Sequence, residues 1–581
     1  MSESQRSLPL EPAAPPRTST RAGRGRKTAA KGSRRKGSAA SRKPTRPARS
    51  AGKRGRGSGA SPSSSAEQMA QRQRDISVSE FFAKNRHLLG FDNPAKALLT
   101  TVKELVDNAL DASDEARLPA EIEIQIDQLA EDRFRVICTD QGPGIVARNV
   151  PSVFGKLLFG SKFHRLKMSR GQQGIGVSAA GMYGLLTTGH PVHVVSRISA
   201  KKPAHRFEIA IDTQKNRPAV KQEAEIEWEL EHGTRVEIEL EASYRKGQHS
   251  VDAYILQISL ANPHATIRYL GPGRENDENP TVYERVTTEL PPETAEIKPH
   301  PYGVELGILM QLLRESKNRN LSGLLTSQFS RVSTRTASEI CKAAGISTSR
   351  RPAAMDRAEA EALHRGIAAS KIMAPPTDCI APIGEDLLTR ALSTIHPCDF
   401  QTAVTRRPAV YRGNPFLVEV ALAWGGGLSA EDPATVYRYA NRVPLQYQQG
   451  GCAITRAVSS TDWKKYGLQQ PRGAGPLGPV VVLIHIASVW VPFTSESKEA
   501  IAHYPEIIKE IKLALQDCGR RLGQHLRRRR READEVKKQD YIKKYIPHVV
   551  QALQAILDLS DKETQRTVVT LTEILERSRK L

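Results

Sequence analysis

The segment Lys103–Ala112 (K-E-L-V-D-N-A-L-D-A) lies late in an apolar pattern of helical period. One face of this helix is expected to pack on a core, because apolar residues recur at Leu98, Val102, Leu105, Val106, Ala109 and Leu110. Glu104 and Asn108 are four residues apart and therefore neighbours on another face. An amide oxygen can ligate a hard cation such as Mg2+, and a carboxylate beside it can orient a water molecule. Taken alone, the pair is more simply an ordinary polar helix face.

A second feature is an acidic residue at the end of a predicted strand. Phe134–Cys138 reads as a strand, and Thr139-Asp140-Gln141-Gly142-Pro143-Gly144-Ile145 follows it. Gly142 and Gly144 let the backbone approach a flat ligand, and the Asp140 carboxylate can accept a hydrogen bond from an exocyclic amine. The alternative is a tight turn with a solvated carboxylate.

A third feature is the glycine-rich stretch Gly171–Ser178 (G-Q-Q-G-I-G-V-S), which leads into a predicted helix. Glycines before a helix can cradle phosphate through backbone N–H groups and the positive end of the helix dipole. The same pattern also fits a flexible hinge. It differs from the dinucleotide-binding fingerprint, because no strand leads directly into it, and the sequence holds no GxxxxGK[ST] motif.

Charge is distributed unevenly along the chain. Residues 1–74 hold 19 Lys and Arg against 3 Glu, a net of +16 out of +23 for all 581 residues. This tail has too few large apolar residues to offset its ordering entropy, so we predict that it is disordered. Its charge favours salt-sensitive nucleic-acid binding, with a solubilising or targeting extension as the alternative.

Cysteine usage and hydropathy indicate in which cellular compartment the protein is expected. The six cysteines are scattered without a C-x-x-C pair, which favours a reducing compartment and argues against a zinc site or a disulfide framework. No apolar run approaches the length of a membrane span, and the first residues lack a signal-peptide core. We therefore predict an intracellular protein without a membrane segment.

The rest of the chain divides by pattern. A helical segment is predicted over 306–385, where Thr336–Glu339 matches a capping box and Gly345 is expected to end the helix. Two continuous apolar runs, Phe416–Trp424 and Val480–Val491, predict buried strands. One long helix is expected from Ser497 to about residue 545, strongly basic in its later part, followed by two short amphipathic helices within 546–581.

Four motifs occur in a fixed order: E-L-V-D-N-A-L-D-A, D-Q-G-P-G-I, R-G-Q-Q-G-I-G-V-S and H-G-T. The combination resembles the GHKL (Bergerat-fold) ATPases, which include gyrase B subunits, mismatch-repair ATPases, heat-shock chaperones and sensor histidine kinases. E-F-F-A-K-N-R, G-F-D-N-P-A-K-A-L, F-G-S-K-F and G-Q-Q-G-I-G-V-S-A-A-G-M-Y-G narrow the resemblance, over about residues 75–545, to the B subunits of DNA topoisomerase VI.

The resemblance implies roles for the motif residues. Glu104 would be the general base that positions the attacking water, and Asn108 would ligate Mg2+. Asp140 would read the adenine amine, and Gly171–Ser178 would form the lid over the triphosphate. Ser161, Lys162 and Thr234 enter through the resemblance alone. The implied ATP site comprises Asn108, Asp140, Gly142, Gly144, Ser161, Lys162, Gly171, Gln172, Gln173, Gly174, Ile175, Gly176, Val177, Ser178, Thr234 and Lys464.

Lys464 belongs to Thr461-Asp462-Trp463-Lys464-Lys465-Tyr466-Gly467, between the two apolar runs. Taken alone, two lysines beside aromatic residues are most simply a solvated loop. A lysine presented to the terminal phosphate is, however, an effective compact cation. The W-K-K-Y segment resembles the family's switch-lysine loop, which implies that Lys464 contacts the γ-phosphate and acts in catalysis, with Lys465 as the alternative.

The resemblance also implies an α+β multidomain fold. Residues 75–305 would form the GHKL ATPase α/β sandwich and 306–385 the helix–two-turns–helix domain. Residues 386–545 would form the transducer, with a ribosomal S5-like βαβ crossover of left hand and a long C-terminal stalk helix. Residues 546–581 would add a C-terminal helical extension.

The implied function is that of the ATP-binding, ATP-hydrolysing subunit of a type IIB DNA topoisomerase, with ATP and Mg2+. ATP would drive self-dimerisation around a DNA duplex, and the DNA-cleaving A subunit, with its tyrosine nucleophile, would complete an A2B2 heterotetramer. We expect a cytoplasmic, nucleoid-associated protein, or a nuclear one in a eukaryote. A non-catalytic DNA-binding scaffold is the alternative. A sensor kinase is disfavoured, because no dimerisation helix carrying a phosphorylatable histidine precedes the motifs.

Overall fold

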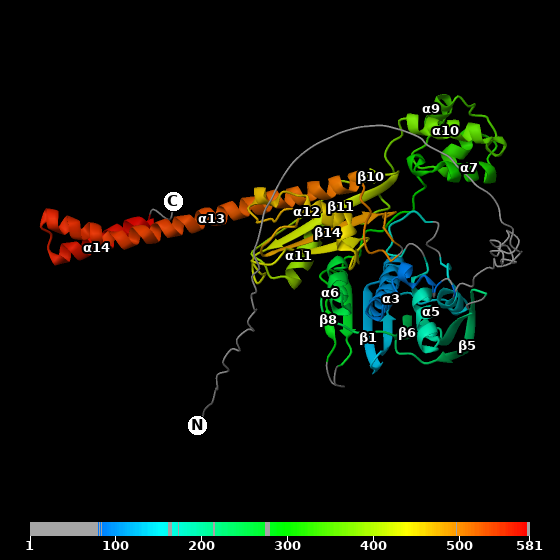
Figure 1. Cartoon of the computed structure of the whole chain (residues 1–581), viewed down its shortest axis with the longest axis horizontal. Helices are drawn as coiled ribbons and strands as arrows, with labels where there is room; N and C mark the ends of the chain where they lie inside the picture. Colours follow the sequence, from blue (N-terminus) through cyan, green and yellow to red (C-terminus); the bar gives the residue numbers. More distant parts are fainter. Residues whose placement is uncertain are drawn as a thin grey trace, which may run out of the picture. The chain divides into compact units, whose positions relative to one another are not determined.

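The computed structural model describes Glu80, Phe82 and residues 84–160, 165–171, 174–212, 215–273, 279–495 and 497–577. The predicted disordered tail, residues 1–74, lies outside this part of the chain. Over the described residues the α+β fold class predicted from the sequence is confirmed, with two separate sheets and a long helix (Figure 1).

The first sheet contains eight strands among the described residues, in the order β5–β4–β3–β6–β2–β1–β7–β8. Only β1 and β7 run parallel, with Ala120 opposite Ala265, and all other neighbours are antiparallel. Asp140 at the end of β2 lies opposite Thr234 on β6, which places two predicted site residues side by side. The strands are β1 (Ala120–Ala130), β2 (Arg133–Asp140), β3 (Val192–Arg197), β4 (Ala204–Asp212), β5 (Arg217–Ile226), β6 (Gly233–Glu241), β7 (Ala265–Leu270) and β8 (Thr281–Tyr283).

Four helices accompany this sheet: α3 (Pro94–Ala116), α4 (Val150–Gly155), α5 (Gly176–Thr188) and α6 (Val251–Ala261). Helix α3 begins at Pro94, because the Asn93 side chain accepts a hydrogen bond from the Lys96 N–H at 2.9 Å and proline is favoured in the first turn. The helix ends at Arg117, which adopts a left-handed conformation with φ of 57°. Its apolar face packs on β1 and β2 beside α5 and α6 (Figure 1).

Four helices follow: α7 (Leu306–Glu315), α8 (Leu321–Gln328), α9 (Thr334–Ala344) and α10 (Arg357–Ala369). Their apolar residues form a separate core that includes Leu324, Ile340 and Leu363. Helix α9 ends at Gly345 as predicted, with φ of 70°. Its N-cap is Ser333, three residues before the predicted cap Thr336, because the Ser333 side chain accepts a hydrogen bond from the Thr336 N–H.

The second sheet contains six strands among the described residues: β9 (Phe400–Thr405), β10 (Ala409–Tyr411), β11 (Asn414–Trp424), β12 (Thr435–Ala440), β13 (Val443–Pro444) and β14 (Val480–Ser488). The two predicted apolar runs form β11 and β14, which pair antiparallel in the middle of the sheet. Strands β12 and β14 pair parallel across a connection that contains α12 (Ala453–Ser459), as a βαβ crossover requires. Helix α11 (Glu385–Ile395) covers one face of this sheet and α13 (Pro505–Leu557) covers the other.

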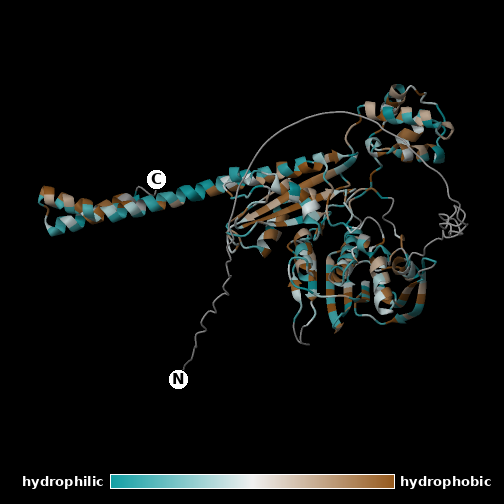
Figure 2. Cartoon of the chain, viewed as in Figure 1, coloured by the Kyte–Doolittle hydropathy of each residue, from teal (hydrophilic) through white to brown (hydrophobic). Residues whose placement is uncertain are grey.

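Helix α13 differs from the prediction at both ends. It begins at Pro505 rather than Ser497, and it runs without interruption through Pro547 to Leu557. The first of the two predicted short helices is therefore the end of α13. The second is α14 (Asp561–Arg577), which packs back on α13 and buries Val550. Figure 2 shows the middle of α13 as hydrophilic and the central strands of the second sheet as hydrophobic.

No helix in the described part of the chain combines the length and the apolar character needed to cross a lipid bilayer.

Trp463 should contribute much more to stability than Trp490. Trp463 is fully buried between the second sheet and α13, and its indole N–H donates to the Val458 carbonyl at 2.9 Å, whereas the side chain of Trp490 is 55% exposed. We expect Trp463→Ala to lower the opening free energy of α12 and β14 amides by about 3–5 kcal/mol, measured by native-state hydrogen exchange. Trp490→Ala is the matched control and should change it by less than about 0.5 kcal/mol. Equal effects of the two substitutions would contradict the packing described.

Candidate functional site

A cavity of about 570 Å3 opens between α3, the end of β2 and the start of α5. The second sheet contributes Pro444 and Tyr447 to its wall, and the loop 497–499 contributes a further segment. The structure brings ten of the predicted site residues to this cavity: Glu104, Asn108, Asp140, Gly144, Gly171, Gly174, Ile175, Gly176, Val177 and Thr234. Segments more than 300 residues apart in the sequence therefore meet at one place.

Other predicted residues lie elsewhere or outside the description. Gly142 and Ser178 do not line the cavity, but they adjoin it, since the Gly142 N–H donates to the Asp140 carboxylate and the Ser178 hydroxyl donates to the Ile175 carbonyl. Four predicted residues, Ser161, Lys162, Gln172 and Gln173, fall outside the described residues.

At one end of the cavity a carboxylate is held without exposure to bulk water. The side chain of Asp140 is 9% exposed, and its Oδ1 accepts from the Gly142 N–H at 2.8 Å. Burial raises the pKa of Asp140 to about 6. Gly144 has φ of 70°, and a Cβ there would lie 2.0 Å from the Arg197 carbonyl oxygen, so only glycine fits. This end of the cavity therefore offers the Asp140 carboxylate as an oriented acceptor, with Thr234 beside it and apolar residues such as Ile145 and Val236 in the same wall.

At the other end α5 begins directly beside Glu104. A Cβ at Gly176 would lie 1.7 Å from Glu104 Oε2, so a larger residue there would displace the Glu104 carboxylate. The N-terminus of α5 carries no side-chain cap, and Gly174–Val177 line the cavity. Uncapped N–H groups and the positive end of the helix dipole make this terminus suitable for an anionic group.

The half-buried Lys103 and the buried Lys498 also line the cavity. Lys498 is 6% exposed, and its Nζ donates to the Arg170 carbonyl at 3.2 Å. Lys103 Nζ lies 3.5 Å from the Ser497 carbonyl, and burial lowers the pKa of Lys103. The Lys498 loop is further held by Glu499, which forms a 2.5 Å ion pair with Lys96.

The structure does not bring Lys464 to the cavity, and this corrects the prediction made for it. Lys464 lies on the short helix η6 (Trp463–Tyr466) and is exposed to solvent, while Lys465 pairs with Asp462 at 3.3 Å. Trp463 is the buried anchor of this turn, and that burial directs the lysines outward. Lys498 is the lysine of the second half of the chain that lines the cavity, together with Lys96 and Lys103 of α3.

The sequence reasoning missed Lys103 and Lys498. Lys103 directly precedes Glu104, but the helix pattern predicts roles only for the carboxylate of Glu104 and the amide of Asn108. Lys498 follows the strand β14 in the polar turn Thr494–Lys498, a strand-end position that could have been weighed against W-K-K-Y.

The donor set fits a magnesium ion carried by a ligand rather than a metal held by protein alone. Among the described residues no group of three or more His, Cys, Asp or Glu side chains lies close enough to hold a metal ion. Asn108 offers an amide oxygen at the cavity wall beside Glu104. Mg2+ is commonly held by one or two protein oxygens together with phosphate oxygens and water.

Comparisons with known proteins show what this chain is similar to. Residues 93–244 match the model of the histidine kinase-, DNA gyrase B- and HSP90-like ATPases, and residues 375–538 match that of the topoisomerase VI B subunit transducer. The B subunit of type 2 DNA topoisomerase 6 from Methanococcoides burtonii is 47% identical over 85% of this chain and 79% of its own length. The corresponding protein of Archaeoglobus fulgidus is 44% identical over 88% and 84%. The gyrase B subunit of Myxococcus xanthus aligns over 77% of this chain and 95% of its own at 13% identity and a TM-score of 0.40.

The ionised Asp140 carboxylate should lower the free energy of unfolding at neutral pH. Because the pKa of this carboxyl is raised from 3.8 to about 6 in the folded protein, its stabilising contribution is present below pH 4 and is lost as the pH rises through about 6. An amide can keep the Gly142 bond without a buried charge. We therefore expect Asp140→Asn to be more stable than wild type at pH 7.5, by about 1–3 kcal/mol, and equally stable near pH 4.

The measurement is denaturant unfolding of both proteins at the two pH values, with the exposed Asp132→Asn as the matched control. A variant less stable than wild type at pH 7.5 would contradict the assignment of a desolvated carboxylate.

Proposed function

The chain belongs to the family of type 2 DNA topoisomerase 6 B subunits, and from this premise we propose that its cavity binds ATP with Mg2+ and hydrolyses ATP to drive passage of one DNA duplex through another. The observation that carries the proposal is the approach of α5 to Glu104 at Gly176, where the carboxylate and an open helix N-terminus share one cavity.

Each group at the cavity has a part in this reaction. Asp140 accepts a hydrogen bond from the adenine amine, with Thr234 beside it on β6. The open N-terminus of α5 binds the phosphates, and Glu104 orients and deprotonates the attacking water. Asn108 holds Mg2+, which supplies positive charge against the phosphate oxygens when it is bound.

We assign the contact with the γ-phosphate to Lys498 in place of Lys464. Lys498 lines the cavity and belongs to the loop that follows the central strand β14 of the second sheet. A compact ammonium on this loop would move toward the terminal phosphate and carry the second sheet with it. Hydrolysis and phosphate release would then change the position of the second sheet, which belongs to the transducer.

The protein acts as one subunit of a topoisomerase complex, and we propose the remaining parts of that complex. DNA cleavage requires a tyrosine nucleophile beside a metal held by acidic residues, and no such metal-binding group occurs in the described residues. A separate A subunit would supply the cleavage site in an A2B2 assembly. Two B subunits would dimerise on ATP and enclose a duplex, in the cytoplasm at the nucleoid.

A non-catalytic DNA-binding scaffold is not favoured. Such a protein could lose the groups at its nucleotide site without consequence. Here Glu104, Asn108, Asp140 and the described lid glycines all meet at one cavity, and a Cβ at Gly144 or Gly176 would collide with the Arg197 carbonyl or the Glu104 carboxylate.

Replacing Glu104 should separate nucleotide binding from hydrolysis. We expect Glu104→Gln to lower kcat by about 10²–10⁴-fold, because an amide cannot accept the proton of the attacking water. The affinity for a non-hydrolysable ATP analogue should change by less than about threefold, because Glu104 acts on the attacking water and the substitution removes no contact with the bound nucleotide. Phosphate release and direct titration measure the two quantities. Glu115→Gln, exposed on the same helix, is the control.

Light scattering with the analogue and Mg2+ tests the proposed nucleotide-dependent dimerisation directly. A shift from monomer to dimer on addition of nucleotide, kept in Glu104→Gln, supports the proposal. A wild-type protein that neither binds the analogue nor changes its mass would favour the scaffold instead.

Matched lysine substitutions test the assignment of the phosphate contact. We expect Lys498→Met to lower kcat by about 10²-fold, because a cation at the terminal phosphate stabilises charge that develops in the transition state. Lys464→Met, measured without DNA, should leave kcat and KM unchanged, since its ammonium is in solvent. The reverse ranking of the two variants would return the role to Lys464.

A further inference from the structure

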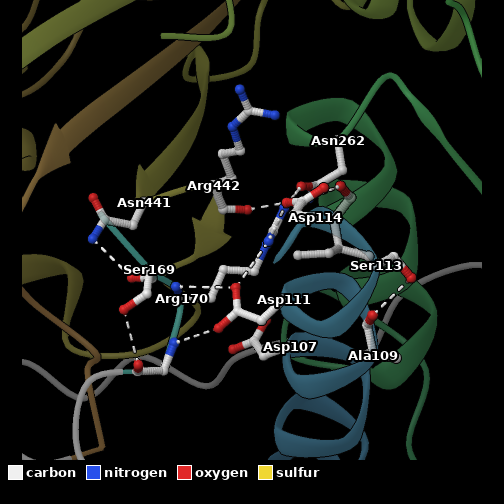
Figure 3. Close-up of polar contacts among 12 residues, drawn as sticks. Asp107, Ala109, Asp111, Ser113, Asp114, Ser169, Arg170, Asn262, Asn441 and Arg442 are labelled. Atoms are coloured by element: carbon white, nitrogen blue, oxygen red, sulfur yellow. Dashed lines mark hydrogen bonds and ion pairs between the residues drawn. The ribbon is translucent and has the colours of Figure 1, made fainter. Parts of the chain in front are cut away.

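The guanidinium of Arg170 joins three parts of the chain that the nucleotide cavity depends on. Arg170 directly precedes the lid glycine Gly171, and its side chain is only 5% exposed. Figure 3 shows it extending from the start of the lid toward α3, between acidic side chains of that helix. Its hydrogen bonds explain why an arginine occupies the position.

The first set of bonds ties the lid to α3. Arg170 Nη1 donates to Asp111 Oδ1 at 3.0 Å and to Asp114 Oδ2 at 2.7 Å. The backbone N–H groups of Arg170 and Gly171 also donate to the Asp111 carboxylate, at 3.3 and 3.2 Å. Asp111 is seven residues beyond Glu104, about two turns along the same face of the helix. The lid therefore starts from the helix that carries the proposed base and the proposed metal ligand.

The second set of bonds ties the lid to the transducer. The Asn441 side chain donates to the Ser169 carbonyl at 2.9 Å, and Lys498 Nζ donates to the Arg170 carbonyl at 3.2 Å. Arg170 Nη2 donates to Asn262, whose own amide donates to the Arg442 carbonyl at 3.4 Å. Asn441 precedes the central strand β14 in the sequence and Lys498 follows it, so segments on both sides of this strand contact Ser169 and Arg170.

The charges of this cluster require the arginine. Asp111 is buried and Asp114 is half-buried, and the nearby Arg170 keeps the pKa of Asp114 far below its usual range although burial acts in the opposite direction. His264 adds a 2.9 Å hydrogen bond to the same carboxylate. Two carboxylates in such a position must be paired with a cation that donates in several directions. Lysine supplies the charge but not the planar fork.

We propose that Arg170 is a positioning residue for ATP hydrolysis, which fixes the base of the lid to α3 and to the transducer at once. A change in the nucleotide bound beside Gly171 then shifts Ser169–Gly171, and the shift reaches the transducer through Asn441 and Lys498. This inference rests on the proposed function. It extends that function by identifying the contact through which the nucleotide state is transmitted.

The expected effect of Arg170→Lys is a loss of turnover without a loss of binding. The lid glycines, Asp140 and Asn108 remain in place, so the affinity for the non-hydrolysable analogue should stay within about threefold of wild type. The base of the lid loses its bond to Asn262 and one of its two carboxylate bonds, so kcat should fall at least tenfold at nearly constant KM. The exposed Arg335→Lys on α9 is the matched control and should leave both constants unchanged.

A second variant tests the transducer side of the same contact. Asn441→Ala leaves the charged cluster intact and removes the transducer's bond to Ser169. It also removes the two bonds between Asn441 and Ser488 at the end of β14, so its effect is compared with any change in its thermal midpoint. It should lower kcat in the same direction, and nucleotide should no longer change hydrogen exchange in β12 and β14 as it does in wild type. Thermal midpoints of all variants identify any effect that is due to stability alone.

The outcomes separate the two hypotheses. Folded Arg170→Lys and Asn441→Ala proteins with wild-type kcat and a wild-type exchange response would overturn the role of Arg170. A fall in kcat in both, with binding retained, supports it. Absent nucleotide binding by the wild-type protein itself would instead overturn the proposed function and this inference with it.

Discussion

The polar face of α3 must bury charge, and much of the structure compensates for that requirement. Asp107 and Asp111 are 2% and 5% exposed on a helix whose other face fills the core of the first sheet. A buried ion is costly unless it is paired and hydrogen-bonded. Arg170 pairs with Asp111, and the Tyr254 hydroxyl donates to Asp107, whose pKa burial raises to about 6. The lid and α6 therefore meet at this helix.

The same constraint explains why the nucleotide cavity is formed by both halves of the chain. The segment that carries Arg170 is held by Asn441, and the loop that carries Lys498 is held by the ion pair of Lys96 with Glu499. A change at the cavity thus reaches the second sheet through short hydrogen bonds rather than through a flexible linker. Its central strands are fully buried between α11 and α13, so this sheet is suited to move as a unit.

Another buried carboxylate, that of Glu419, orders the junction where the helical segment returns to the second sheet. Both oxygens of Glu419 accept hydrogen bonds, from the Ile383 and Gly384 N–H groups at 2.8 Å and from His485 Nδ1 at 2.8 Å. His485 Nε2 accepts from the Arg442 N–H, so the ring is neutral, and burial lowers its pKa. Strands β11 and β14 are thereby joined to the start of α11 next to the contacts of the lid.

The sequence by itself determined what depends on local pattern and on chemistry that acts over a few residues. The period of α3, the apolar runs of β11 and β14, the strand end at Asp140 and the glycines Gly144 and Gly176 were all readable, because each follows from side-chain spacing or from a steric requirement at one position. Only the tertiary structure decided which distant residues complete the cavity. Trp463 is buried and directs Lys464 outward, whereas Lys498 is drawn inward by contacts with Arg170 and through Glu499 with Lys96. Burial is a property of the packed chain, so the choice between two lysines 34 residues apart could not be made from the sequence.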